Sequence, residues 1–146
     1  MERHGKRVLV VDDDDLARDL LVVLLLQAGY YVFIARNGLE ALLEMTRRRF
    51  HVVISDNHMS PVSGLDFLAL SGLNWPETPV VMVSGDQPDM AEQAICLGAY
   101  AWLQKPYDGD HLLGVIRAAV QPADEKHARR TPAARCAWSS INTVRS

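Results

Sequence analysis

Five short aliphatic runs recur along the chain, and each is followed by a segment with helical spacing of apolar residues. The runs are rich in Val and Ile and show no alternation of apolar and polar positions, which is typical of strands buried on both faces of a parallel sheet. Strand and helix therefore alternate, and the pattern predicts an α/β fold with a doubly wound parallel sheet. The predicted strands are 8–11, 31–35, 51–55, 79–84 and 100–103.

The helical segments carry start and stop signals that fit this alternation. The first helix is expected from about Asp14 to Ala28, with acids in its opening turn and Gly29 as its C-terminal stop. Asn37 is expected to cap the second helix, which ends near a run of three arginines. The remaining helices are expected from Gly64 through Leu70, after residues 86–89 through Leu97, and after Asp108 through Val120.

The first predicted helix is unusually apolar, because residues 20–26 are all aliphatic and cover more than one helical face. Such a helix either presents a surface to a partner or lies in the centre of the fold, enclosed by its neighbours. We favour the enclosed position.

Polar side chains stand at the ends of several predicted strands, where ligands bind in open α/β sheets. Asp12 and Asp13 follow the first strand, Asp56 follows the third, Ser84 ends the fourth and Lys105 follows the fifth. Three neighbouring carboxylates repel one another unless a cation lies among them, and hard oxygen ligands favour magnesium or calcium. The pattern therefore predicts a divalent metal site beside a hydroxyl and an amine.

This set of groups suits phosphoryl transfer. A carboxylate can attack phosphorus and form an acyl phosphate while a metal and a lysine neutralise the phosphoryl oxygens. Asp56 is the best candidate nucleophile because it stands alone at the end of its strand, whereas Asp12 and Asp13 form a pair suited to holding metal. Each residue by itself also fits a simpler role, such as a capping acid or a surface lysine. The joint placement of the set favours the functional interpretation.

Composition and charge change this picture mainly at the C-terminal end. A chain of 146 residues with 49% hydrophobic and 23% charged residues fits one globular domain plus a tail. Residues 1–125 carry ten basic and eighteen acidic residues, whereas residues 126–146 carry five basic residues and no acid. No nucleic-acid recognition motif accompanies these basic residues. We therefore expect one domain over 1–122 and a basic, flexible tail or linker over 123–146.

The sequence contains no apolar run long enough to cross a bilayer, and its start, MERHGKRV, lacks the apolar core of a signal peptide. We therefore expect a cytoplasmic protein without membrane contact. Cys96 and Cys136 are expected to be free thiols, with a disulfide between them as the alternative.

The segments KRVLVVDDDD, ARNGLEAL, HVVISDNHMSPVSGLDF, PVVMVSGD and LGAYAWLQKPY follow one another along the chain. Together they resemble the receiver domains of response regulators in two-component signalling, of which the chemotaxis response regulator is the simplest comparison, over about residues 6–120. The resemblance implies a flavodoxin-like sheet with strand order 2-1-3-4-5. It also implies a signalling domain, not a conventional enzyme, that catalyses only its own phosphorylation and dephosphorylation.

The same resemblance implies which residues bind the metal. Asp56 is the implied phosphorylation site, and Asp13 and Asp56 are the implied direct ligands of Mg²⁺. Asp12 is implied to act mostly through water, and the backbone carbonyl of His58 completes the protein ligands.

The remaining implied roles concern the phosphoryl group and a conformational switch. Ser84 and Lys105 are implied to contact the phosphoryl group, and Gly85 leaves room for it. Trp102 takes the place of the aromatic residue that follows Ser84 inward on phosphorylation, where the family more often has Tyr or Phe. A partly buried structural tryptophan is the alternative interpretation of Trp102.

The chain departs from the family pattern after Asp56. Ser60 stands where the family usually has proline and Pro61 follows it, while Gly64 keeps its usual offset. His58 and Asp86 occupy positions that tune phosphoryl lifetime in the family, so we expect both to affect dephosphorylation.

The resemblance implies that a sensor histidine kinase or a phosphotransfer protein donates the phosphoryl group and that a downstream protein partner reads it. It leaves homodimer formation open and implies no direct nucleic-acid contact by this domain. No output motif is visible after residue 121. A stand-alone receiver and a fragment of a longer regulator or hybrid kinase both remain open.

Two other functions fit parts of the pattern. A haloacid-dehalogenase-type phosphatase would use Asp12 as nucleophile and Asp14 as acid, but it leaves Asp56 unused and lacks a further acidic pair after Lys105. A receiver fold that signals by protein contact without phosphorylation is the second alternative, and the complete acidic set argues against it.

Overall fold

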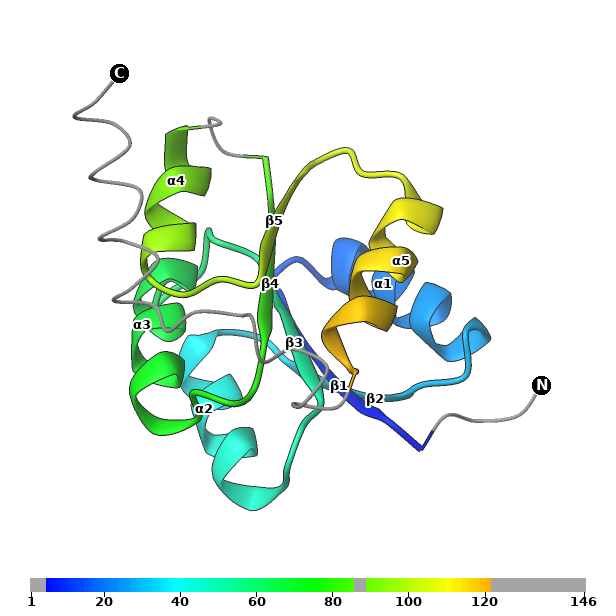
Figure 1. The fold of residues 1–146 in the computed structure, drawn as a ribbon, viewed down its shortest axis with the longest axis horizontal. Coiled ribbons are helices and arrows are strands. Elements are labelled where there is room, and N and C mark those ends of the chain that lie inside the picture. The colour runs from blue at the N-terminus through cyan, green and yellow to red at the C-terminus, as the bar shows by residue number, and fades with distance from the viewer. Residues whose placement is uncertain (1–4, 86–88, 122–146) are drawn as a thin grey trace.

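The computed structural model describes residues 5–85 and 89–121. In this part of the chain five strands alternate with five helices (Figure 1). The strands are β1 (Arg7–Val11), β2 (Tyr31–Ala35), β3 (Val52–Ser55), β4 (Val80–Ser84) and β5 (Ala101–Gln104). The helices are α1 (Asp15–Gln27), α2 (Gly38–Arg47), α3 (Gly64–Asn74), α4 (Asp89–Cys96) and α5 (Gly109–Ala119).

The strands form one parallel sheet in the order β2-β1-β3-β4-β5, which confirms the expected fold class and strand order. Val11 at the end of β1 pairs with Ala35 of β2 on one side and with Ser55 of β3 on the other. The first and third strands therefore end side by side. This register brings the residues that follow them to one edge of the sheet.

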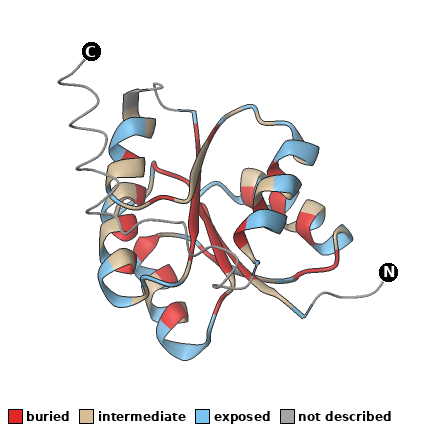
Figure 2. Cartoon of the chain, in the orientation of Figure 1, coloured by how far each residue is buried: buried red, intermediate tan, exposed pale blue. Residues whose placement is uncertain are grey.

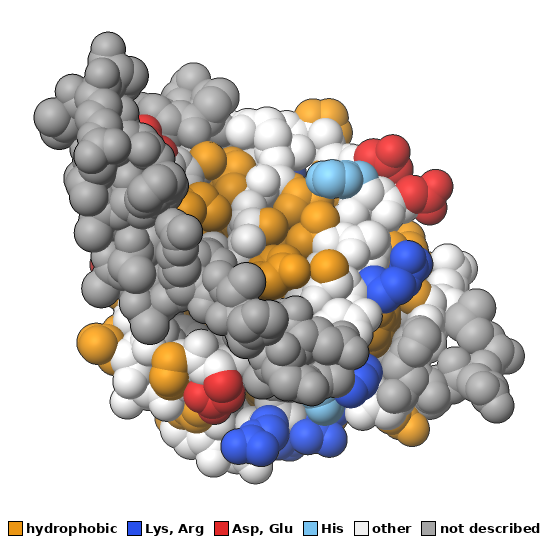
Figure 3. Space-filling view, viewed as in Figure 1, with side chains coloured by type: hydrophobic (Ala, Val, Ile, Leu, Met, Phe, Trp, Pro, Cys, Tyr) orange, Lys and Arg blue, Asp and Glu red, His pale blue; other side chains and the backbone are white. Residues whose placement is uncertain are grey.

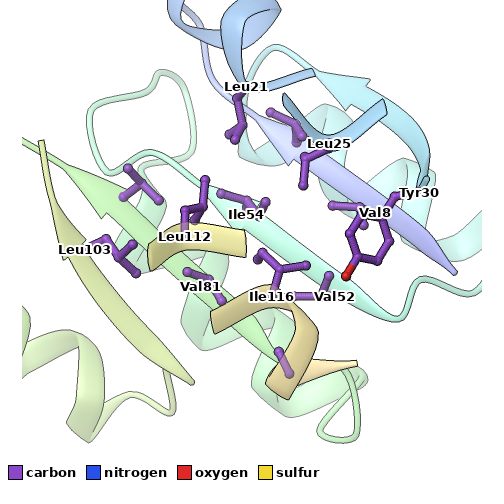
Figure 4. Packing of buried hydrophobic residues seen from close by; sticks show 13 residues of the cluster. Val8, Leu21, Leu25, Tyr30, Val52, Ile54, Val81, Leu103, Leu112 and Ile116 are labelled. Carbon is purple, nitrogen blue, oxygen red and sulfur yellow. The ribbon is translucent and has the colours of Figure 1, made fainter. Parts of the chain in front are cut away.

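Helices cover both faces of the sheet. Figure 1 shows α1 and α5 on one face and α2, α3 and α4 on the other. Alternate residues of the central strands pack into two separate cores, so that Val8 and Val10 face α1 and α5 while Leu9 and Val11 face the opposite helices. The three central strands, β1, β3 and β4, are the most buried elements (Figure 2), and Figure 4 shows the core beneath α1 and α5. Burial on both faces explains the continuous Val and Ile runs of the sequence.

The helix starts follow the capping signals of the sequence. The side chains of Asp14, Asn37 and Asp108 each accept hydrogen bonds from backbone N–H groups at the start of the following helix. Gly29 follows α1 with a φ of 98°, a left-handed conformation that favours glycine.

The third helix is longer than expected. It continues to Asn74, so the prediction that it ends at Leu70 was wrong. Ser71 and Gly72 favour a stop by local propensity, but Ser71 is fully buried and its hydroxyl lies 3.9 Å from the sulfur of Met45 on α2. Packing against α2 therefore overrides the local signal.

The expected enclosure of α1 was also wrong. Leu16, Leu20 and Val23 are 69%, 63% and 52% exposed, while Leu21 and Leu25 pack into the core. One stripe of the helix is buried, Val22 and Leu24 are partly buried beside it, and the side chains on the opposite side face solvent.

Several basic residues lie at the edge of the sheet where the strands begin. Lys6 and Arg7 lie where β1 begins, and α2 ends at Arg47. Figure 3 shows lysine and arginine side chains at the lower edge and on the right side of this face. The aspartates that follow β1 and β3 lie at the opposite edge of the sheet. Across the described ranges, each helix is too short or too polar to cross a membrane.

Candidate functional site

The site lies at the carboxyl edge of the sheet, where β1 and β3 end. The backbone N–H of Asp56 donates to the carbonyl of Val11 at 2.9 Å, and that of Asp12 donates to the carbonyl of Ala35 at 3.1 Å. The strand ladders thus continue through both aspartates. Asp12 and Asp56 are buried, with 6% and 8% of their surfaces exposed.

Three aspartates converge at this edge. One carboxylate oxygen each of Asp12, Asp13 and Asp56 lies within 4.8 Å of the others. Asp12 and Asp56 are buried, whereas Asp13 is exposed. Within residues 5–85 and 89–121, this is the group of acidic, histidine or cysteine side chains close enough to share one metal ion. The structure therefore brings together the three carboxylates selected from the sequence.

The four consecutive aspartates after β1 have different environments. Oδ1 of Asp12 accepts a hydrogen bond from the backbone N–H of Asp14 at 2.9 Å. Oδ1 of Asp14 accepts from the backbone N–H groups of Leu16 and Ala17, which makes Asp14 the cap of α1. Asp15 forms an ion pair with Arg18. The capping role of Asp14 disfavours its use as the acid of a phosphatase.

Lys105 contributes the cation of the site. Its ammonium nitrogen lies 3.5 Å from Oδ2 of Asp12 and 3.4 Å from Oδ1 of Asp56. The backbone N–H of Lys105 donates to the carbonyl of Ser84 at 2.9 Å, which extends the β4–β5 ladder to the same edge. The ammonium contacts two of the three carboxylates, so the cluster keeps a net negative charge that suits a hard divalent cation.

The pKa values of the site follow from this charge balance. Burial raises the pKa of Asp56; the Lys105 ammonium opposes the shift, and the neighbouring Asp12 adds to it. Burial lowers the pKa of Lys105, but Asp56 and Asp12 offset that effect and raise it above its ordinary value. The pKa values of Asp56 and Lys105 can both be raised, because two carboxylates share one ammonium. The arrangement favours a charged lysine beside an aspartate that is costly to ionise.

Ser84 and Trp102 lie near this edge on neighbouring strands. Ser84 is the fully buried last residue of β4. Trp102 pairs with Met82 of β4 and packs against the core beneath α2, α3 and α4. Its indole nitrogen is buried without a hydrogen-bond partner among the described residues. Leaving a buried indole N–H without a partner costs free energy. No polar contact among the described residues fixes the position of the Trp102 ring.

The loop after β3 is shaped by Asn57 and Gly64. The Asn57 carbonyl accepts from the Gly64 N–H at 2.9 Å, and the Asn57 side chain accepts from the Leu65 N–H at 3.2 Å. A Cβ on Gly64 would collide with the Asp56 carbonyl and lie 2.6 Å from Cα of Asn57. Only glycine fits this position.

Two hollows flank the three aspartates. A cavity of about 540 Å³ lies on the α1 side and includes Asp12, Asp56 and Lys105 in its lining. A hollow of about 510 Å³ lies on the α3 side and is lined by Asp13 and by the exposed His58. His58 thus lies on the Asp13 side of the cluster.

Sequence reasoning missed Arg18 and Tyr107. Arg18 is 5% exposed, and its guanidinium donates to the backbone carbonyl of Asp12 at 3.0 Å. Its helical offset from Leu21 and Leu25 places it on the buried stripe of α1, and that was the available signal. Tyr107 lines the cavity on the α1 side, and its pKa is raised by burial.

Some expectations fall outside the described residues. These are the role of Asp86, the state of Cys136 and the whole of segment 123–146. Cys96 lies on α4, and the choice between free thiols and a disulfide with Cys136 falls outside the described residues.

Comparison with known proteins gives consistent matches. The family model of the response regulator receiver domain matches residues 8–117. The nitrogen assimilation regulatory protein NtrX of Azorhizobium caulinodans is 33% identical over 117 residues, which are 78% of this chain and 26% of that protein.

Solved structures agree with this match. The receiver domain of NtrX from Brucella abortus has a TM-score of 0.74 and 34% sequence identity, over 77% of this chain and 97% of that one. The chemotaxis response regulator CheY4 of Vibrio cholerae has a TM-score of 0.73 and 31% identity, over 79% of this chain and 98% of that one. The chain spans about a quarter of the length of the first curated relatives it matches.

Proposed function

The chain belongs to the response regulator receiver family of two-component signalling, and on that premise we propose that Asp56 is the residue that accepts the phosphoryl group. One observation carries the proposal: the buried Asp56 carboxylate lies 3.4 Å from the Lys105 ammonium and within 4.8 Å of two further carboxylates. The combination supports the proposal, because phosphoryl transfer needs a nucleophile, a cation and metal-ligating oxygens around one point. These groups suit phosphoryl transfer to Asp56 better than a phosphatase that uses Asp12 or a receiver that is not phosphorylated.

We further propose that the three aspartates hold Mg²⁺. The donor set fits, because three carboxylates share a single ammonium and a divalent cation would balance the remaining charge. Asp13 and Asp56 would bind the metal directly, Asp12 mostly through water, and the His58 backbone carbonyl would complete the protein ligands. Bound Mg²⁺ supplies charge neutralisation for the phosphoryl oxygens.

The residues then divide the chemistry among them. An Asp56 carboxylate oxygen attacks the phosphorus of a donor, the bond from phosphorus to the leaving group breaks, and an acyl phosphate forms. Lys105 neutralises one phosphoryl oxygen, and the Ser84 hydroxyl donates a hydrogen bond to another. Water later attacks the phosphorus, the bond from phosphorus to the Asp56 oxygen breaks, and inorganic phosphate leaves while the carboxylate is regenerated. The chain therefore catalyses only its own phosphorylation and dephosphorylation.

Hydroxylamine trapping tests this assignment. An acyl phosphate reacts with hydroxylamine to leave a hydroxamate on the carbonyl carbon, and peptide mass spectrometry locates that change. We expect the hydroxamate at Asp56 after treatment with acetyl phosphate and Mg²⁺, and unmodified peptides around Asp12 and Asp13. A hydroxamate at Asp12 would favour the phosphatase-like alternative.

We propose that phosphorylation switches a protein-interaction face through Ser84 and Trp102. Movement of the Ser84 hydroxyl toward the phosphoryl group would free space along β4, and Trp102 on the adjacent strand is not held by a hydrogen bond among the described residues. In a Trp75→Phe, Trp138→Phe background, beryllium fluoride with Mg²⁺ should change the fluorescence of Trp102. Ser84→Ala should abolish the change, and an identical response in that variant would contradict the switch.

The partners follow from the family. A sensor histidine kinase or a phosphotransfer protein would donate the phosphoryl group, and a downstream protein would read the switched face. Residues 1–122 would form the receiver unit, with 123–146 as a tail or linker. Because the matched segment makes up about a quarter of these relatives, the proposal keeps two forms, a receiver that acts alone and a receiver within a longer regulator.

A further inference from the structure

An apolar cavity adjoins the proposed phosphorylation site. It measures about 540 Å³, within the range of roughly 300–1,000 Å³ that is usual for small-molecule pockets. It lies between α1 and the loop that joins β5 to α5. Most of its lining is apolar and includes Ala17, Leu20, Leu21, Ile54, Val83 and Pro106. Figure 4 shows Leu21 and Ile54 on the same side of the sheet.

One end of this cavity is polar. Asp12, Asp56 and Lys105 line it together with the aliphatic walls. A molecule in the cavity can therefore place an anionic group against the Lys105 ammonium and the proposed nucleophile while its remaining atoms contact hydrocarbon. The cavity and the reactive carboxylate form one continuous site.

The hollow on the other side of the aspartates has a different character. Its lining mixes polar side chains, among them Asp13 and His58, with the apolar side chains of Met59, Leu65 and Met90. Asp56 lines the cavity on the α1 side, whereas the next residue, Asn57, lines the other hollow. An apolar group is favoured in the cavity on the α1 side, because transfer of apolar surface out of water is favourable.

We propose that this cavity receives the acyl group of a small acyl phosphate that phosphorylates Asp56, and that it selects aromatic or branched acyl groups over acetyl. The inference rests on the proposed role of Asp56. It adds a selectivity among acyl phosphate donors and the surface that determines it, formed chiefly by Ala17 and Leu20 of α1.

The reaction is balanced without a further reactant. A carboxylate oxygen of Asp56 forms a bond to phosphorus, and the bond from phosphorus to the acyl oxygen breaks. The electron pair leaves with that oxygen, so the donor departs as a free carboxylate and no proton has to move. The cavity holds the departing acyl group, and Lys105 faces the phosphoryl oxygens.

The expected selectivity follows from the buried area. At about 25 cal/mol per Å² of apolar surface, placing a phenyl ring instead of a methyl group in the cavity favours the aromatic donor by roughly tenfold. Benzoyl phosphate and acetyl phosphate also differ in intrinsic reactivity. The informative quantity is therefore the benzoyl-to-acetyl rate ratio, compared between variants.

Four proteins make the test specific. Ala17→Leu fills the cavity, and Leu20→Ala removes part of its wall at a site that is 63% exposed. Leu16→Ala is the matched control, since Leu16 is an exposed leucine of the same helix outside the cavity lining. Phosphorylation of each variant and of the wild type is followed by intact mass with each donor and Mg²⁺, and thermal melting verifies folding.

We expect the rate ratio to fall roughly tenfold in Ala17→Leu, to fall by a smaller factor in Leu20→Ala, and to stay within about twofold of the wild type in Leu16→Ala. If acetyl phosphate gives an adduct on all four proteins and the benzoyl-to-acetyl rate ratio is the same in all of them, the cavity proposal is overturned and Asp56 remains the acceptor. No adduct from either donor would overturn both. If Ala17→Leu does not fold, Leu20→Ala against Leu16→Ala decides the question.

Discussion

The ammonium nitrogen of Lys105 lies 3.4 Å from Oδ1 of Asp56. The same nitrogen lies 3.5 Å from Oδ2 of Asp12, so a single positive charge serves two buried carboxylates. The shared ammonium offsets the repulsion between the acids, and it also repels any divalent cation that they bind. Lys105 is therefore expected to weaken metal binding while it supports phosphoryl transfer.

Replacing Lys105 with Met should separate these two effects. Loss of the charge removes the repulsion from a bound cation, so Lys105→Met should bind Mg²⁺ several-fold more tightly in a fluorescence titration. The same variant should be phosphorylated more slowly by acetyl phosphate. Lys6→Met at the opposite edge of the sheet is the control and should change neither quantity. Weaker Mg²⁺ binding in Lys105→Met would contradict the electrostatic account.

Asp56→Asn should stabilise the protein at neutral pH when no divalent metal is added. The folded state raises the pKa of Asp56, chiefly through burial, so the side chain's contribution to stability is present below the unfolded pKa and lost as pH rises through the folded pKa. Asparagine does not ionise, so the variant keeps this contribution to stability as pH rises. We expect a melting temperature a few degrees higher at pH 7, with the difference vanishing below about pH 3.9.

Asp66→Asn serves as the control for this pH dependence. Asp66 is an acid in the first turn of α3, where a negative charge is favourable, so its loss should lower the melting temperature slightly. Equal melting profiles of wild type and Asp56→Asn from about pH 3 to 8 would argue against a buried, destabilising carboxylate.

Gly64→Ala should destabilise the fold because its methyl group would collide with the Asp56 carbonyl. Overpacking of this kind costs about 1–3 kcal/mol, and the Asp56 backbone has to move to relieve it. Gly114→Ala is matched to it: Gly114 lies inside α5, and an added methyl group there would meet no atom within 4 Å, so alanine should stabilise by about 1 kcal/mol. Urea unfolding measures both, and similar free energies for the two variants would contradict the close approach.

Arg18→Met tests the buried contact behind the β1–α1 loop. The substitution leaves the Asp12 carbonyl without the guanidinium donor and should cost about 1–3 kcal/mol in the free energy of unfolding. Asp15→Asn removes only the exposed ion-pair partner, whose side chain is 80% exposed, and should cost less than about 1 kcal/mol. If Asp15→Asn lowers the free energy of unfolding as much as Arg18→Met does, Arg18 stabilises the fold through its ion pair with Asp15 and not through the Asp12 carbonyl.

The sheet and the acidic cluster were predictable because both depend on local signals. Strands buried on both faces require continuous Val and Ile runs, and the parallel register carries Asp12 and Asp56 to one edge. Asn37 was recognisable as a cap for the same reason, since capping involves only neighbouring backbone.

The remaining features depend on packing between distant segments. The extension of α3 past Ser71 requires contact with Met45, and the cavity needs Leu20 of α1 opposite Pro106. The exposure of α1 was mispredicted because an aliphatic run does not reveal which of its sides the sheet covers. Arg18 was detectable only by tracing its helical offset from Leu21.

Intact-protein mass spectrometry tests the central claim most directly. Wild type and Asp56→Asn are each incubated with acetyl phosphate, with and without Mg²⁺. The account predicts one phosphoryl adduct on the wild type in the presence of Mg²⁺, and none on Asp56→Asn under either condition. An equal adduct on Asp56→Asn, or no adduct and no binding of beryllium fluoride by the wild type, would contradict it.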